Sequence, residues 1–406
     1  MEQNVEVGCR SYKTMKTTYH FDFVSTKACN ELKQCTVDKH LNSLPLGYQT
    51  LHDAFIVPSD GFNRAGVCTS AKEFIPSSSF SGGEQRTVAF ETFRRVEESA
   101  IYVGCLYSVW GHAFLDNLRR LWFLTSVEGK DLIAAGVHLV YVNHYRSAPG
   151  DNFWKLVRML GLPVERFELV DECTQFSTLY LPDASFCYAE NASFTKEHND
   201  LIEQILAQVP VDSRFENVYF SRACLGNQQW RDYGEYKIER VFKKLGYSIF
   251  CPEKLSLEEQ LLLLKNCKKF AAAEGSVAHN SIFCRMGTKV VILRKADYVN
   301  EYQLAINEMR SLDVTYVDVH HSVPPYPNSI MIGPFYLYIT KELQRFAGFY
   351  IPHLTYWMMP SYWWYVIRRI PWVERHFSNR RIVHRIEYSL WSKHMHANDE
   401  IRNYRL

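Results

Sequence analysis

Residues 268–294 read KKFAAAEGSVAHNSIFCRMGTKVVILR, and they hold two apolar runs separated by a polar turn. The runs at 268–274 and 289–295 each have the length of a buried strand, and the segment between them is typical of a short helix. A strand, a helix and a second strand in this order predict a parallel pair of strands. Glu274 and Gly275 then lie at the carboxyl end of a strand, where open parallel sheets bind their ligands.

The same alternation extends to both sides of this stretch through the second half of the chain. Ser256, with Glu259 three residues further on, fits a capping box at the start of one predicted helix. Strands that alternate with helices indicate a parallel sheet with helices on its faces. The predicted strands are 217–222, 248–252 and 314–321, and the predicted helices are 234–247, 255–267 and 302–312.

The first half of the chain shows a weaker version of this pattern. Residues 1–95 are irregular, with short extended pieces at 50–58 and 86–93. We therefore predict an α/β protein with two halves that face a cleft, divided as residues 1–210 and 211–335, with a link near 210–214 and a helical segment at 336–406. Beyond residue 95 the predicted strands are 100–107 and 137–143, and the predicted helices are 112–126, 152–162 and 196–209.

The composition is that of an ordinary globular protein, with 47% apolar and 22% charged residues. A formal net charge of +2 gives no reason to expect nucleic acid as a partner. We find no signal-peptide core at the N-terminus and no apolar span of about 20 residues for a transmembrane helix. The 11 cysteines contain no C-x-x-C pattern, so we expect reduced thiols and no metal site. These features predict a soluble, cytoplasmic protein.

The segment 336–406 is rich in aromatic and basic residues. It could pack as a helical segment across the first half of the protein. Alternatively, it could touch an anionic membrane surface, because Trp and Tyr suit the headgroup zone and Arg attracts anionic lipid. The best candidate for such a contact is MPSYWWYVIRRIPW at 359–372.

The turn after the strand at 268–274 carries the first candidate site. Gly275 lets the backbone approach a ligand closely, and Ser276 can cap the following helix or donate to a phosphate oxygen. Glu274 could accept hydrogen bonds from the hydroxyls of a ribose or a sugar, and His279 could bind a phosphate. The alternative is a capped helix whose Glu and His are solvated or packed.

Two further groups carry candidate chemistry. His112 and Asp116 are four residues apart, and a carboxylate that fixes the tautomer of a histidine prepares it as a general base. The alternative is an ordinary surface pair. Arg222 at a strand end and Arg231 in a loop precede Glu235, and two convergent arginines suit a diphosphate.

The order of these motifs resembles glycosyltransferase family 61 (DUF563), in particular its bacterial capsule and surface-polysaccharide members. An H-x-x-x-D-N-L-x-R-L-W motif at 112–122 is followed by S-R at 221–222, G-Y-x-I-x-x-P-E at 246–253 and E-G-S-x-x-H-N at 274–280. The resemblance covers about residues 98–320.

This resemblance implies a GT-B-like fold with two Rossmann-like domains, an acceptor-side domain first and a nucleotide-sugar-binding domain second. Gly234 stands where the family usually has Asn, and Glu274 and His279 follow the bacterial variant of the motif. His112 and Asp116 match the catalytic positions. The positions that match the nucleotide-sugar site are Ser221, Arg222, Arg231, Glu235, Glu274, Gly275, Ser276, His279 and Asn280.

The expected reaction is inverting transfer of a sugar from a nucleotide sugar, with a UDP-sugar as the expected donor, to a saccharide or lipid-linked saccharide. The base is His112 oriented by Asp116, or Asp116 itself. Arg222 and Arg231 would stabilise the departing diphosphate, so no metal cofactor is expected. Two alternatives are another polysaccharide-modifying transferase, such as a pyruvyl transferase, and a non-catalytic scaffold member of a polysaccharide assembly complex. The expected location is the cytoplasm, with a peripheral place at the inner face of the plasma membrane as the alternative.

Overall fold

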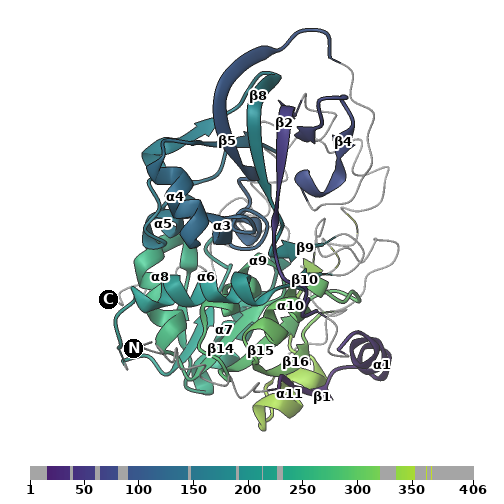
Figure 1. Ribbon diagram of the computed structural model, residues 1–406. Helices are drawn as coiled ribbons and strands as arrows, with labels where there is room; N and C mark the ends of the chain where they lie inside the picture. The colour runs from purple at the N-terminus through teal and green to yellow at the C-terminus, as the bar shows by residue number, and fades with distance from the viewer. Residues whose placement is uncertain are drawn as a thin grey trace, which may run out of the picture.

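The computed structural model shows two large sheets stacked end to end, each flanked by helices, and the described residues also form two sheets of two strands each (Figure 1). It describes residues 16–36, 40–59, 65–80, 90–144, 148–188, 192–212, 214–225, 232–320, 335–352, 363 and 367. The protein is therefore a mixed α/β protein, as the sequence predicts.

The first sheet has seven strands in the order β4-β3-β2-β8-β5-β6-β7. β5 pairs in parallel with β6 and β8, and β7 pairs in parallel with β6, whereas β2, β3 and β4 pair in antiparallel fashion. The strands are β2 (Tyr48–Val57), β3 (Gly66–Cys68), β4 (Phe74–Ile75), β5 (Arg94–Leu106), β6 (His138–Asn143), β7 (Phe167–Leu169) and β8 (Thr174–Pro182).

The second sheet has six strands, all parallel, in the order β1-β16-β15-β14-β11-β13. Its strands from the second half of the chain confirm the predicted alternation. They are β11 (Asn217–Phe220), β13 (Ser248–Phe250), β14 (Lys269–Ala273), β15 (Lys289–Arg294) and β16 (Asp313–Asp318).

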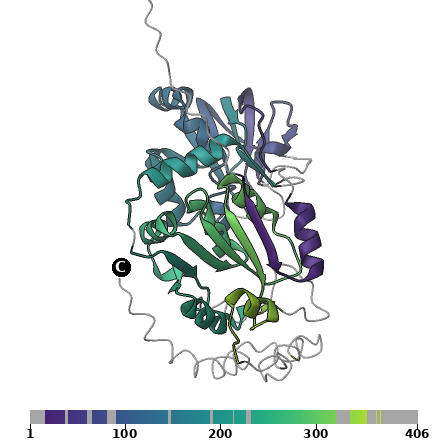
Figure 2. The same ribbon diagram turned by 90° about the horizontal axis from the view of Figure 1, so that it is seen from below.

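The N-terminal segment departs from the expected division of the chain at residue 210. β1 (Thr18–Phe23) forms the edge of the second sheet, where it pairs in parallel with β16, and α1 (Thr26–Cys35) follows it there (Figure 2). Residues 1–210 are therefore not one unit. The expectation failed because a single edge strand carries no local signal of the sheet it joins.

Most helices lie where the amphipathic pattern predicts them. The Ser256 side chain accepts from the Glu259 backbone N–H, and the Glu259 side chain accepts from the Ser256 backbone N–H. The predicted capping box at the start of α8 is therefore confirmed. The main helices are α4 (Val127–Ala134), α5 (Asp151–Met159), α6 (Lys196–Ala207), α7 (Glu235–Lys244), α8 (Leu257–Asn266), α10 (Glu301–Met309) and α11 (Lys341–Ala347). The short strands are β9 (Phe186–Cys187), β10 (Ser193–Phe194), β12 (Asp232–Tyr233) and β17 (Phe335–Tyr336).

The predicted helix at 112–126 is broken in two. α2 (Trp110–Ala113) and α3 (Leu121–Thr125) are separated by turns. The side-chain amide of Asn117 accepts from the Tyr107 backbone N–H at 3.0 Å and donates to the Tyr107 carbonyl at 2.9 Å, so it ties the turns between α2 and α3 to the residue that follows β5. His198 Nε2 donates to the Phe114 carbonyl at 3.0 Å and satisfies a group that the broken helix leaves unpaired.

One apolar core runs through both halves of the protein. It joins side chains of β5 and the α2–α3 segment, such as Phe114 and Leu118, to side chains of the second sheet, such as Phe220, and of the 3-10 helix Asn280–Phe283, such as Phe283. The rings of Phe114 and Phe283 meet edge to face with centroids 5.3 Å apart. This shared core fixes the position of the first half relative to the second.

The described beginning of the C-terminal segment packs as α11 against β1 and β16 of the second sheet. One other expectation needs correction. Cys224 and Cys251 form a disulfide, although we expected reduced thiols. Most of the segment 353–406 lies outside the described residues. Among the described helices, none has both the length and the apolar character needed to cross a membrane.

Candidate functional site

The candidate residues gather where the carboxyl ends of the second sheet meet α2 of the first half. α9 (Ser276–His279) follows β14 directly and lies at the junction between the two sheets (Figure 1). The chain reverses at Gly275, whose φ of 112° belongs to the left-handed region that favours glycine. α9 has only four residues, so the expected helix-dipole contribution to anion binding is small.

His112 and Asp116 form the predicted pair even though the helix between them is broken. His112 Nδ1 lies 2.6 Å from Asp116 Oδ2. Since the carboxylate accepts, Nδ1 donates and Nε2 is the nitrogen that can take a proton from a substrate. The His112 side chain is 17% exposed and that of Asp116 is 0% exposed, so His112 shields the carboxylate from solvent.

Aromatic rings from both halves surround His112. Its ring centroid lies 5.1 Å from that of Phe80, 5.4 Å from Tyr107 and 5.7 Å from Tyr302. Tyr302 belongs to α10 of the second half, so this candidate base sits at the junction and not on a remote face of the first half. These rings limit the rotamers that the imidazole can adopt.

α2 and α9 approach each other closely at Gly111. A Cβ placed on Gly111 would lie 3.0 Å from Ser276 Oγ and 3.2 Å from His279 Nδ1. The absence of a side chain at Gly111 therefore lets the helix that carries His112 touch the helix that carries Ser276 and His279. The motifs at 112–116 and 274–280, more than 150 residues apart in the sequence, are brought together here.

His279 and Asn280 have partners within the protein. Asn300 caps α10 by accepting from the Gln303 N–H, so its amide nitrogen donates to His279 Nε2 at 3.0 Å. His279 therefore carries its proton on Nδ1, a buried atom without a hydrogen-bond partner. Burial, and then the charge of His112, lower the pKa of His279 to about 3. His279 is consequently neutral at physiological pH.

Asn280 connects the two halves. Trp110 Nε1 of α2 donates to Asn280 Oδ1 at 2.9 Å, and the amide nitrogen of Asn280 donates to the backbone carbonyls of Ser276 and Val277. This places Asn280 in the packing of the junction and leaves its side chain little capacity for a ligand.

Glu274 is buried at the end of β14, with 1% of its surface exposed. It accepts from the backbone N–H of Lys295, and its Oε2 has no hydrogen-bond partner among the residues that the structure describes. Burial raises the pKa of Glu274 to about 7, although Arg294, Lys295 and His320 oppose this shift. A buried carboxyl oxygen without a partner can accept a hydrogen bond from a ligand hydroxyl.

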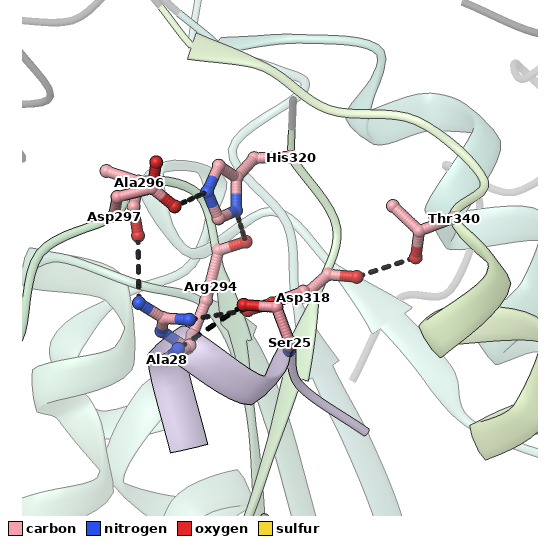
Figure 3. Close-up of polar contacts among 8 residues, drawn as sticks. All are labelled: Ser25, Ala28, Arg294, Ala296, Asp297, Asp318, His320 and Thr340. Carbon is pink, nitrogen blue, oxygen red and sulfur yellow. Dashed lines mark hydrogen bonds and ion pairs between the residues drawn. The ribbon is translucent and has the colours of Figure 1, made fainter. Parts of the chain in front are cut away.

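A polar network connects the ends of β15 and β16 (Figure 3). Arg294 Nη1 donates to Asp318 Oδ1 at 2.7 Å, and Asp318 Oδ2 accepts from the Ser25 N–H at 2.8 Å. His320 lies between the Arg294 carbonyl and Asp297 Oδ1, at 3.0 Å from each. The network therefore ties the start of α1 to the strand ends, and sequence reasoning missed it because its members carry no common spacing.

Arg222 reaches the same place from β11. A Cβ placed on Gly275 would lie 3.9 Å from Arg222 Nη1 and 3.6 Å from Lys295 Nζ. Arg222 was predicted as a donor-site residue, whereas Lys295 was not. The run at 289–295 ends on Lys295, so a basic residue at a predicted strand end was the available signal.

Ser221 and Glu235 are occupied by internal hydrogen bonds. The Ser221 hydroxyl donates to Glu239 and accepts from the Ala223 N–H, and Glu235 accepts from the Tyr219 hydroxyl at 3.0 Å. Both residues thus support the segment that carries Arg222. Arg231 lies outside the described residues.

Gly234 occupies a position that only glycine fits. Its φ is 95°, and a Cβ there would lie 2.0 Å from the Leu337 carbonyl oxygen. The family's usual Asn tolerates positive φ but has a Cβ, so the nearby Leu337 backbone explains this departure.

Comparisons with known proteins agree with the predicted family. Residues 110–291 match the family model described as Glycosyltransferase 61. No curated protein matches the sequence. Among solved structures, the dodecameric iron-containing heptosyltransferase TibC in complex with ADP-D-beta-D-heptose is similar at 14% identity, with a TM-score of 0.28 over 70% of this chain and 80% of that one. A second structure of TibC, from enterotoxigenic E. coli, gives 14% identity and a TM-score of 0.29 over the same shares.

Proposed function

We propose that this chain, whose residues 110–291 match the Glycosyltransferase 61 family model, is an inverting enzyme that moves a sugar from a nucleotide sugar to a hydroxyl of a surface-polysaccharide acceptor. The observation that carries this proposal is the junction of α2 and α9. There a histidine–carboxylate pair lies beside the Glu274–Ser276 turn and Arg222.

In this mechanism His112 is the base. Its Nε2 takes the proton of the acceptor hydroxyl while the oxygen attacks the anomeric carbon, and Asp116 stabilises the resulting imidazolium through the 2.6 Å bond to Nδ1. The alternative base, Asp116 itself, is less accessible, because its side chain is 0% exposed behind the His112 ring. General-base assistance of this kind contributes about 10²–10⁴-fold to a rate.

The nucleotide diphosphate leaves from the opposite face of the sugar. Arg222 stabilises the developing negative charge, with Arg231 as a further candidate outside the described residues. Glu274 accepts from a hydroxyl of the ribose or of the sugar through its unpartnered Oε2. With arginines in this role, the proposal needs no metal cofactor. A UDP-sugar is the donor we propose to test first.

The arrangement we infer is GT-B-like, with acceptor binding on the first sheet and donor binding at the carboxyl ends of the second. Open parallel sheets bind ligands at these ends, which supports the donor side of the proposal. Contact of the segment 336–406 with anionic lipid stays a prediction, and liposome sedimentation of the full chain against a chain truncated after Tyr336 would check it.

A panel of nucleotide sugars tests the proposed function. A ligand that binds only the folded state raises the melting temperature, so the donor should stand out by thermal shift. The identified donor is then incubated with saccharide acceptors, and release of the nucleoside diphosphate is measured for wild type, His112→Ala and Arg222→Ala.

Both variants should lose transfer, His112→Ala with donor binding retained and Arg222→Ala with donor binding weakened. Unchanged transfer in both would refute the assignment. Transfer of a pyruvyl group without nucleotide release would favour the pyruvyl transferase, and a wild-type protein that binds no nucleotide sugar would favour a scaffold.

A further inference from the structure

We propose that Lys295 is a second cation for the diphosphate of the donor, next to Arg222. This inference rests on the proposed function and extends it to a residue outside the residues 110–291 that match the family model. It would make the diphosphate site of this chain a lysine–arginine pair.

The position of Lys295 follows from the pairing of β14 with β15. Ala273 lies opposite Leu293 in the parallel register, so Gly275 and Lys295, two residues beyond each, emerge together at the carboxyl end of the sheet. The Lys295 Nζ and Arg222 Nη1 atoms lie 3.6 Å and 3.9 Å from the same point beside the Gly275 Cα atom. Two cationic groups thus converge where the backbone has no side chain.

The side chain of Lys295 is held in this place. The residue is 3% exposed, and its Nζ lies 4.5 Å from the centroid of the Phe335 ring. An aromatic face attracts an ammonium group within about 6 Å. Burial and this ring contact therefore hold the Lys295 side chain in place more firmly than that of a lysine on the open surface.

Two cationic groups that converge on one point suit a doubly charged anion, and a diphosphate is such an anion. Lys295 is buried, whereas Arg222 is half-buried. Glu274 is an acid near Lys295, and because burial raises its pKa to about 7 it carries only part of a negative charge at neutral pH. Glu253 is a further acid near Arg222.

The alternative is that Lys295 serves only as a counter-ion that keeps Glu274 ionised. The two roles differ in what the lysine does for nucleotides of different charge. A cation that touches the diphosphate favours a nucleoside diphosphate over the matching monophosphate. A counter-ion of Glu274 would affect both nucleotides to the same extent.

The test is isothermal titration of the intact chain with UDP, ADP, GDP and CDP and with the corresponding monophosphates. We compare wild type with Lys295→Met and Lys295→Arg, and with Lys289→Met as the matched control. Lys289 is an exposed lysine at the opposite, amino end of β15. Lys295→Gln tests the same point if Lys295→Met does not fold, and the melting temperature of each variant is recorded.

For the nucleoside that wild type prefers, Lys295→Met should lower the affinity for the nucleoside diphosphate about 10-fold or more, because a hydrogen bond to a charged group is lost. The affinity of Lys295→Met for the monophosphate should fall clearly less. Lys295→Arg should bind the diphosphate with an affinity within a few fold of wild type, and Lys289→Met should bind it with the affinity of wild type. Diphosphate binding unchanged in Lys295→Met, or equal losses for both nucleotides, would overturn the role of Lys295 and leave the proposed function standing. A wild-type protein that binds no diphosphate would overturn both.

Discussion

Replacement of Asp116 by Asn tests the proposed base with a change of a single atom. The Asp116 side chain is 0% exposed, and its Oδ2 accepts from His112 Nδ1 at 2.6 Å. In Asp116→Asn the amide can present its nitrogen to Nδ1, and His112 then carries its proton on Nε2. The imidazole would lose the lone pair that takes the proton of the acceptor hydroxyl.

The size of the effect follows from this geometry. Positioned general-base catalysis is worth about 10²–10⁴-fold, and the Asp-to-Asn change in a Ser-His-Asp triad lowers kcat by about 10⁴-fold. We therefore expect kcat to fall by about 10²–10⁴-fold, which is about 3–5 kcal/mol of transition-state stabilisation. The donor should bind as before, because Asp116 faces His112 and not the turn at Gly275.

The assay measures release of the nucleoside diphosphate during transfer, and donor affinity is measured separately by titration. Glu128→Gln is the matched control, since Glu128 is a carboxylate of the first half that accepts from the Tyr48 hydroxyl at 2.5 Å, away from the junction. Its kcat should equal that of wild type. Melting temperatures of both variants show whether the fold is intact.

Two results would refute the reasoning. An Asp116→Asn variant that is folded and retains kcat to within about 10-fold of wild type would show that the pair is not the base. A His112→Gln variant with full activity, together with an inactive Asp116→Asn variant, would transfer the role of base to Asp116.

The remaining predictions concern the junction and the donor side. Glu274→Gln should stabilise the protein at high pH: burial raises the pKa of Glu274 from 4.5 to about 7, so the wild-type folded state loses stability as the pH rises through this window. In denaturant titrations, the free energy of unfolding of the variant should be higher than that of wild type by about 3 kcal/mol at pH 8 and by less than about 1 kcal/mol at pH 5. An equal difference at both pH values would contradict this prediction. Trp110→Phe removes the 2.9 Å bond to Asn280 and should lower the free energy of unfolding by about 1–3 kcal/mol, because a buried acceptor is left unsatisfied; a loss below about 0.5 kcal/mol would show that the bond is dispensable. Gly234→Asn should destabilise the protein by about 2 kcal/mol or more in the same measurement, although Asn is the usual family residue, because its Cβ would lie 2.0 Å from the Leu337 oxygen; an unchanged stability would mean that the Leu337 backbone yields.

The candidate site was predictable where its chemistry follows local order. The run at 268–274 identified β14, and the polar residues after it identified the turn that carries Glu274 and Gly275. The spacing of His112 and Asp116 predicted their contact, although that prediction assumed one continuous helix. The helix between them breaks, and the pair survives because Asn117 and His198 stabilise the turns that replace it.

Other parts of the site had no local signal. Lys295 ends a predicted strand, but its place beside Arg222 depends on the register of β14 and β15 and on the path of β11. The Cys224–Cys251 disulfide joins the loops after β11 and β13, which lie side by side only because these strands pair. The expectation of reduced thiols came from the lack of a recognised export signal and from the cysteine spacing, and neither could include this pairing.

The sequence by itself determined the α/β class, the helices and strands of the second half, and the candidate residues at the strand ends. Hydrophobic periodicity and capping depend on neighbours a few residues away, so they can be read from the chain directly. Only the tertiary structure decided that β1 joins the second sheet and that Gly111 lets His112 approach Ser276 and His279. These are contacts between distant segments, and they depend on which surfaces pack together once the shared core forms.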